Sequence, residues 1–368
     1  MKNIEFKLPI PIQSVFVIAE AGVNHNGDAD LAVELVEAAI DSGADAIKFQ
    51  TFSADEVVTQ DAEKAEYQKR QTGEASQWEM LRELELPREL HFQLKDICEQ
   101  VGVEFMSTAF DEKSLEFLVK EVGVKRLKIP SGEITNGPFL LEHAQTGLDC
   151  IVSTGMANLG EIEEALGVLA FGYLAGSKSP GRNAFREAYR SRQGQDLLKQ
   201  HVSLLHCTTD YPAAYESLNL RAMDTMASAF ELPVGYSDHS IGLAVPLAAV
   251  ARGACIIEKH FTLDRNLPGP DHSASLNPGE LTQMVAGIRA VESALGFSEK
   301  MASDGEWANI PIARRSLVAD NSIETGESFS SKNLGIKRPG HGISPMEYWD
   351  HLGRSAARKY DKDELIGD

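Results

Sequence analysis

Residues 234–239 read VGYSDH and residues 255–260 read CIIEKH. Each segment is a short apolar run that passes directly into charged side chains and closes on a histidine, His239 or His260. An apolar run followed directly by charged residues is typical of a parallel strand that is buried on both faces and whose carboxyl end borders an active site. Any single histidine is more often a hydrogen-bonded core residue. Two imidazoles in matching places at strand ends instead predict a metal site.

The same pattern occurs eight times along the chain, with helical patterns between nearly all of the runs. Alternating strands and helices predict a parallel α/β sheet, and eight units over roughly 250 residues match a closed (β/α)8 TIM barrel. Residues 1–295 are therefore expected to form a TIM-barrel catalytic domain. The apolar runs are residues 15–19, 44–49, 104–107, 126–129, 150–153, 202–206, 234–237 and 255–258, and the helical patterns include 28–42, 86–100, 111–122, 158–169 and 278–295.

Three segments depart from this alternation. Residues 51–85 are too long for an ordinary connection and carry Trp78 and Met80, so we expect a lid over the barrel mouth. Residues 172–200 are basic for this protein and are expected to elaborate the helix after the fifth strand. After residue 295 the pattern changes to a linker, 296–309, and a small second domain, 310–368. The core of that domain is predicted from residues 316–319, 323, 329, 334 and 336.

Composition limits the classes of partner. The chain has 368 residues, 43% of them hydrophobic, and a formal net charge of -20, which repels nucleic acids and anionic lipid surfaces. The four cysteines lie far apart, and no apolar run approaches membrane-spanning length. We expect a cytoplasmic enzyme without nucleic-acid or membrane partners, whose anionic ligands need cations gathered in one cleft.

Ten motifs, in order along the chain, resemble the sialic acid (nonulosonic acid) synthase family of bacterial type. The resemblance implies a TIM barrel followed by a C-terminal antifreeze-like (SAF, β-clip) domain, assembled as a domain-swapped homodimer. The motifs are IAEAGVNHNGD (18–28), AIKFQTF (46–52), MSTAFD (106–111), LKIPSGEI (127–134), VSTGMA (152–157), LLHCTTDYP (204–212), GYSDHS (235–240), IIEKHFTLD (256–264), GPDHSAS (269–275) and KRPGHGIS (337–344).

The resemblance also implies the reaction. An N-acetylneuraminate (sialic acid) synthase condenses phosphoenolpyruvate with the N-acetylated amino sugar N-acetylmannosamine, releasing phosphate and a nine-carbon 2-keto acid. The alternative is an N,N'-diacetyllegionaminic acid synthase, which uses a 2,4-diacetamido-2,4,6-trideoxy hexose. A divalent metal on His239 and His260 would polarise the aldehyde oxygen, and imidazole with oxygen ligands suits Mn²⁺, with Mg²⁺ or Co²⁺ as alternatives.

Site roles follow residue by residue from the matching motifs. Glu20 lies at the end of the first predicted strand. It is expected either to accept or donate a proton in the reaction or to form a salt bridge to a nearby lysine. Arg338 would reach the sugar's acetamido group from the partner subunit. The catalytic residues are expected to be Glu20, Lys48 and Asp271, and the substrate-binding residues Gln50, Thr108, Lys128, Ser131, Ser153, Tyr211, Ser237 and Arg338.

Two departures and two other classes of protein stay open at this stage. Thr209 stands where the family often has asparagine, and the 172–200 segment is an insert relative to the pattern. A histidine-based metallohydrolase would act without phosphoenolpyruvate, and a carbohydrate-binding barrel would bind sugar without turnover. The metallohydrolase is disfavoured because only two strong ligand histidines are found and the lysines would be surplus. The presence of a full set of catalytic residue types argues against the binding barrel: Glu20, Lys48, Lys128, His239 and His260.

Overall fold

The chain divides into two compact units, each with its own hydrophobic core. The computed structural model describes residues 14–64 and 76–367. The units are Met1–Gly296 and Phe297–Asp368. None of the helices that the structure describes is long and apolar enough to cross a membrane.

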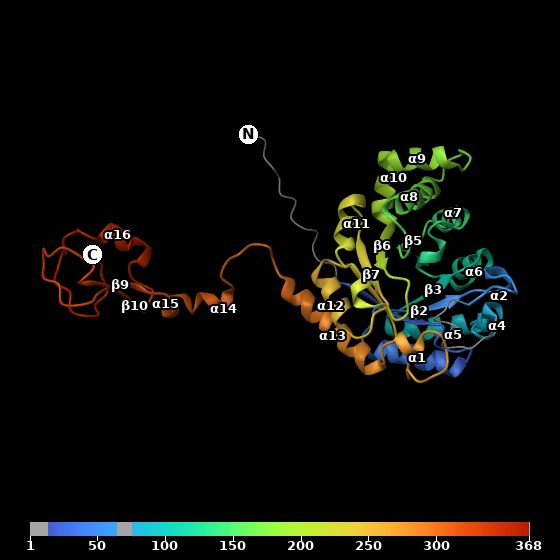
Figure 1. The fold of residues 1–368 in the computed structure, drawn as a ribbon, viewed down its shortest axis with the longest axis horizontal. Coiled ribbons are helices and arrows are strands. Elements are labelled where there is room, and N and C mark those ends of the chain that lie inside the picture. Colours follow the sequence, from blue (N-terminus) through green and yellow to red (C-terminus); the bar gives the residue numbers. More distant parts are fainter. Residues whose placement is uncertain (1–13, 65–75, 368) are drawn as a thin grey trace. The chain divides into compact units, whose positions relative to one another are not determined.

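Eight parallel strands form the centre of the first unit (Figure 1). Hydrogen-bonded neighbours follow the order β3-β2-β1-β8-β7-β6-β5-β4, and the end strands β3 and β4 lie beside each other, so the sheet is a TIM-barrel-like cylinder. The predicted parallel eight-stranded sheet is confirmed. The strands are β1 (Phe16–Gly22), β2 (Ala46–Thr51), β3 (Glu104–Ala109), β4 (Arg126–Ile129), β5 (Asp149–Ser153), β6 (Val202–Cys207), β7 (Val234–Asp238) and β8 (Ile256–His260).

Several strands continue past their apolar runs into the polar motifs. In β1 the ladder pairs Glu20 with Lys48 on one side and with His260 on the other. Backbone amides form a parallel ladder whatever side chain they carry, so polarity does not end a strand. Glu20, Lys48 and His260 therefore stand on rigid strands, whereas His239 follows directly after the end of β7.

Helices surround the strands and bury their apolar faces against them. Polar caps begin several of these helices: the Asp28 side chain accepts from Leu31 N at the start of α1, and Asn158 with Glu161 forms a capping box on α8. The predicted helix over 111–122 becomes π-helical over its last five residues, Leu118–Val122. The helices are α1 (Ala29–Asp41), α5 (Arg88–Val101), α6 (Glu112–Phe117), α7 (Gly137–Gln145), α8 (Leu159–Leu174), α11 (Ala222–Phe230), α12 (Ala244–Ala251) and α13 (Pro278–Leu295).

The two long segments add helices of their own. In the 51–85 segment the described residues form α2 (Ala54–Val57) and α4 (Gln77–Glu83), and residues 65–75 lie outside the described part of the chain. The 172–200 segment completes α8 and then forms α9 (Arg182–Arg190) and most of α10 (Arg192–His201), which pack on α8 (Figure 1).

The second unit is built around a two-stranded antiparallel sheet of β9 (Ser316–Ala319) and β10 (Leu334–Lys337). Its core contains Leu317, Phe329 and Leu334, but Ile336 is 38% exposed, so its prediction as a core residue is wrong. Leu334 belongs to the hydrophobic core of this unit, but the core does not extend along β10 as far as Ile336. Short helices α14 (Asp304–Trp307), α15 (Ile310–Ala313) and α16 (Tyr348–His351) complete the unit, and α14 lies within the segment expected to be a linker.

Candidate active site

A cavity of about 290 Å³ opens at the carboxyl ends of the barrel strands. It is lined by twelve of the thirteen predicted site residues; the thirteenth, Arg338, is exposed and belongs to the second unit. Closure of the barrel brings all eight carboxyl ends to one rim, which explains why residues up to 251 positions apart in sequence share one cavity. The twelve are Glu20, Lys48, Gln50, Thr108, Lys128, Ser131, Ser153, Tyr211, Ser237, His239, His260 and Asp271.

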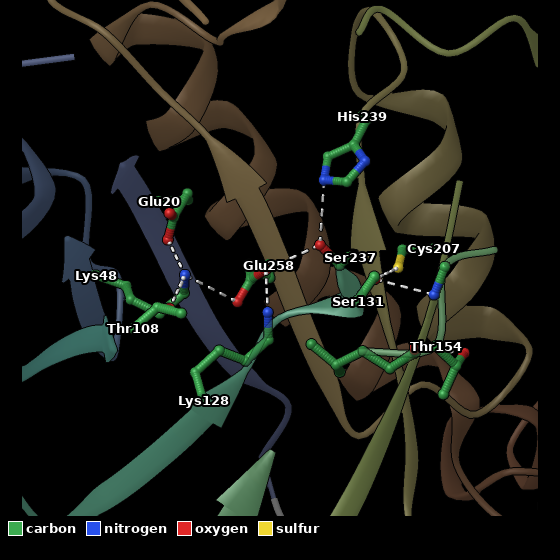
Figure 2. Close-up of polar contacts among 12 residues, drawn as sticks. Glu20, Lys48, Thr108, Lys128, Ser131, Thr154, Cys207, Ser237, His239 and Glu258 are labelled. Atoms are coloured by element: carbon green, nitrogen blue, oxygen red, sulfur yellow. Dashed lines mark hydrogen bonds and ion pairs between the residues drawn. The ribbon is translucent and has the colours of Figure 1, made fainter. Parts of the chain in front are cut away.

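A buried network of charges occupies the floor of this cavity (Figure 2). Lys48 Nζ lies 2.5 Å from Glu20 Oε2 and donates to Thr108 Oγ1 at 3.0 Å. Lys128 Nζ donates to Glu258 Oε1 at 3.1 Å, and Glu258 Oε2 lies 3.7 Å from Lys48 Nζ. The salt bridge that the sequence left open for Glu20 is therefore present, and two carboxylates already balance the two lysines.

Glu258 is a site residue that the motif analysis did not single out. It stands in the middle of β8, is 4% exposed, and accepts a hydrogen bond from Ser237 Oγ at 2.9 Å. Burial opposes its ionisation, but the adjacent Lys128 and Lys48 outweigh burial and hold its pKa well below the ordinary value. A glutamate inside an apolar run, in CIIEKH, was the signal that could have identified it.

The pKa of Glu20 is shifted in the opposite direction from that of Glu258, although both carboxyls are buried. Burial raises the pKa of Glu20 to about 7, against the opposing pull of Lys48. The pKa of Lys48 is raised, because Glu20 and Glu258 together outweigh its burial. A carboxyl that titrates near neutrality can exchange a proton with a bound substrate, as general acid–base chemistry requires.

The two histidines meet on one side of the cavity. Their ring centroids are 5.6 Å apart, and the Tyr211 ring lies 4.2 Å from that of His239. His239 Nδ1 donates to the Thr208 carbonyl at 2.6 Å, so its Nε2 carries the lone pair. Ser237 Oγ lies 3.5 Å from this Nε2 but donates its proton to Glu258 at 2.9 Å, which leaves the lone pair available. His260 Nδ1 is buried and has no hydrogen-bond partner among the described residues, and Asp271 Oδ2 lies 3.8 Å from it.

Electrostatics keep both imidazoles neutral. Burial lowers the pKa of His239, and burial together with the neighbouring His239 and Lys48 holds the pKa of His260 well below its ordinary value. Burial raises the pKa of Asp271 to about 6. Within residues 14–64 and 76–367, no group of three or more histidine, cysteine or acidic side chains is close enough to hold a metal by itself. The donor set fits a cation held by two neutral imidazoles with other oxygen ligands.

The side of the cavity opposite Lys48 is a cluster of hydroxyl groups and a close-packed backbone turn. Ser131 Oγ accepts from Gly155 N at 3.0 Å and lies 3.1 Å from Cys207 Sγ (Figure 2). A Cβ atom on Gly155 would come within 2.4 Å of Thr209 Oγ1. Only glycine fits between these groups, so a side chain at this position would displace them.

Behind the histidines, a buried ion pair holds the ends of β7 and β8 together. Lys259 Nζ lies 2.6 Å from Asp238 Oδ2, and the two side chains are 1% and 0% exposed. Asp238 Oδ1 accepts from Ser240 N at 2.9 Å, and Lys259 also donates to the Ser240 carbonyl. The pair therefore fixes the backbone on both sides of His239.

Comparisons with known proteins agree over nearly the whole chain. A family model described as the NeuB family matches residues 35–300. The chain is 49% identical over 339 residues to the N,N'-diacetyllegionaminic acid synthase of Legionella pneumophila, covering 92% of this chain and 89% of that protein. It is 48% identical over 356 residues to the N,N'-diacetyllegionaminic acid synthase of Campylobacter jejuni, with 96% and 99% covered. The solved structure of an N-acetylneuraminic acid synthetase from Leptospira borgpetersenii is 33% identical, with a TM-score of 0.65 and 84% and 94% covered.

Proposed function

The chain belongs to the NeuB family, and on that premise we propose that it is an N,N'-diacetyllegionaminic acid synthase. It condenses phosphoenolpyruvate with a 2,4-diacetamido-2,4,6-trideoxy hexose. The relatives with that name are 49% and 48% identical to this chain, whereas the N-acetylneuraminic acid synthetase of known structure is 33% identical. These identities reverse the order of the sequence analysis, which placed N-acetylmannosamine first.

The identity to two N,N'-diacetyllegionaminic acid synthases carries the choice of sugar, and the charge balance on the cavity floor carries the choice of mechanism. Lys48 and Lys128 face Glu20 and Glu258, so the network by itself offers no large positive excess to a substrate that carries phosphate and carboxylate. Protonation of Glu20, whose pKa is about 7, would free one positive charge. Binding of so strong an anion in a buried site calls for a further cation.

We propose that His239 and His260 hold this cation, a divalent metal for which Mn²⁺ is the first candidate and Mg²⁺ or Co²⁺ are alternatives. When bound, it would polarise the aldehyde oxygen of the open-chain sugar as a Lewis acid. His239 suits this role because its Nδ1 is committed to the Thr208 carbonyl. Asp271 lies 3.8 Å from His260 Nδ1 and would orient the sugar beside it.

The remaining residues divide between the two ends of phosphoenolpyruvate and the acceptor. Lys128, Ser131, Ser153 and Ser237 would hold the phosphate, because their hydroxyl groups and ammonium line one side of the cavity. Lys48, Gln50, Thr108 and Tyr211 line the rest. The methylene carbon of phosphoenolpyruvate would attack the aldehyde carbon, water would add to the cationic C2 that results, and phosphate would leave by C–O cleavage to give the 2-keto acid. Glu20 would accept the proton of that water at its carboxyl oxygen.

The proposal extends to the second unit, as an antifreeze-like (SAF) domain in a domain-swapped homodimer. Apolar side chains are exposed in that unit, with Met346 81% and Trp349 73% exposed, and on the barrel's mouth loops, with Met156 73% exposed. Such surfaces favour coverage by another chain. Arg338 of the partner subunit would then contact the sugar's acetamido group.

Phosphate release from phosphoenolpyruvate, measured separately with the diacetamido-trideoxy hexose and with N-acetylmannosamine, tests the reaction. We expect release with the former, its loss after treatment with a chelator, and its return when Mn²⁺ is added. His239→Ala should stay folded by circular dichroism but release no phosphate. Release with neither sugar, or full activity in chelated enzyme, would contradict the proposal.

Mixed dimers test the shared site. Arg338→Ala and Lys48→Ala are each expected to be inactive as homodimers, but their mixture contains one site with both residues intact. Activity in the mixture above that of either parent is expected. A mixture as inactive as its parents would rule out a site completed in trans.

A further inference from the structure

The active-site cavity has two chemically different halves. One half holds the charged strand ends described above. The other is a surface of hydrocarbon and thioether groups, which we call the apolar wall. It consists of Val23, Phe52, Val57, Met80, Leu81, Leu84 and Phe110.

The apolar wall is a separate cluster and not an extension of the barrel core. Phe52 and Phe110 follow β2 and β3 and meet edge to face, with ring centroids 6.1 Å apart. Met80, Leu81 and Leu84 come from α4 and the residue that follows it. These side chains pack on one another and still line the cavity. The wall exists because α4 and the residues directly after β2 turn apolar side chains toward the barrel mouth.

Polar groups are scarce on this half of the cavity. Among the described residues of the 51–85 segment beyond β2, Gln77 is the one polar side chain that lines the cavity. A hydroxyl group that faces the wall would therefore exchange water for hydrocarbon without gaining a hydrogen bond. A methyl group in the same place would lose no hydrogen bond and would leave water.

We propose that the apolar wall is the specificity determinant of this enzyme, and that it selects sugars whose far end carries methyl groups in place of hydroxyl groups. The inference rests on the proposed function. The reacting aldehyde needs the charged half of the cavity, so the rest of the sugar is left to the wall. The diacetamido-trideoxy hexose carries a C6 methyl and two acetamido methyls, whereas N-acetylmannosamine carries hydroxyl groups at C4 and C6 and one acetamido methyl.

The size of the effect follows from the chemistry of such pockets. One missing or added methylene in an apolar pocket changes kcat/KM by about 10–200-fold. We expect wild-type enzyme to prefer the trideoxy sugar over N-acetylmannosamine by a ratio of kcat/KM values in or above this range. Phosphoenolpyruvate should bind equally well with either acceptor, because it occupies the charged half.

Met80→Gln tests the wall with little change in side-chain length, because both side chains are unbranched. Leu81→Gln is a second variant at a half-buried position, where glutamine keeps a good helix propensity. In each variant the ratio of kcat/KM values should fall by about 10-fold or more, while KM for phosphoenolpyruvate stays unchanged. The matched control is Met284→Gln, which changes a buried methionine of α13 outside the cavity and should leave the ratio unchanged.

The outcomes separate this inference from the proposed function. Wild-type enzyme that releases phosphate with neither sugar would overturn both. Wild-type enzyme that uses the trideoxy sugar while folded Met80→Gln and Leu81→Gln keep the wild-type ratio would overturn the inference alone. Equal use of the two sugars by the wild type would also overturn it, and would leave phosphoenolpyruvate condensation standing.

Discussion

Replacing Lys259 with methionine is expected to destabilise the barrel strongly, because it removes one partner of a buried ion pair. Lys259 and Asp238 are 1% and 0% exposed, and their charged atoms are 2.6 Å apart. Without the lysine, the Asp238 carboxylate would stay buried, with the Ser240 amide as its one remaining donor among the residues that the structure describes. Breaking a buried pair in this way costs about 3–5 kcal/mol, because the remaining charge is left uncompensated.

Neutralising both partners should restore most of that loss. In the double variant Asp238→Asn/Lys259→Met no charge is buried, and the asparagine oxygen can still accept from the Ser240 amide. Replacing a whole buried pair is often close to neutral, so we expect a free energy of unfolding within about 1–2 kcal/mol of wild type. The two substitutions should therefore show a coupling energy of about 2 kcal/mol or more in a double-mutant cycle.

Urea unfolding followed by circular dichroism measures these free energies, with unchanged m-values as the sign that the unfolded state is the same. The double variant should also bind Mn²⁺ about 10–100-fold more weakly by calorimetry, because the backbone around His239 loses its anchor. The matched control is Arg126→Met, which removes an ion pair with Glu104 at the opposite ends of the strands. Additive destabilisation, or a double variant with wild-type metal affinity, would refute the reasoning.

Three further predictions follow from single sites. Burial lowers the pKa of His143 to about 4, whereas the unfolded chain has the ordinary value of about 6.5. The free energy of unfolding should therefore fall by about 3 kcal/mol as the pH drops from about 6.5 to about 4. In His143→Gln the urea midpoint should depend less on pH than in the wild type, and an unchanged dependence would contradict this. In Gly155→Ala, where the new Cβ would lie 2.4 Å from Thr209 Oγ1, KM for phosphoenolpyruvate should rise about 10-fold or more, and an unchanged KM would show that the turn adapts. Glu258→Gln should lower KM for phosphoenolpyruvate, because it removes a negative charge from the cavity. It should also lower kcat about 10-fold or more, because Lys48 and Lys128 lose the carboxylate that positions them. Steady-state kinetics separate the two effects, and a rise in KM with unchanged kcat would refute the assignment.

Much of the site could be predicted from the sequence because it is encoded locally. Polar residues near the end of an apolar run or directly after it, such as Lys48 and His239, mark the carboxyl ends of strands. Once eight such strands form a closed barrel, their carboxyl ends necessarily lie on the same rim. The parallel eight-stranded sheet followed from this repeated pattern, whereas the twelve residues around the cavity were assigned through the resemblance of the motifs to a known family.

Other features depend on partners that are distant in sequence. Glu258 acquires its role from Lys128, 130 positions away, and that contact exists only because β4 and β8 face each other across the barrel. The exposure of Ile336 depends on where the core of the second unit ends, which strand alternation does not encode. The division of the cavity into a charged half and an apolar wall arises where α4 packs beside the strand ends. Local side-chain pattern determined the strands and their polar ends, whereas charge balance, pKa values and the shape of the cavity were decided by tertiary packing, because they depend on distances across the barrel.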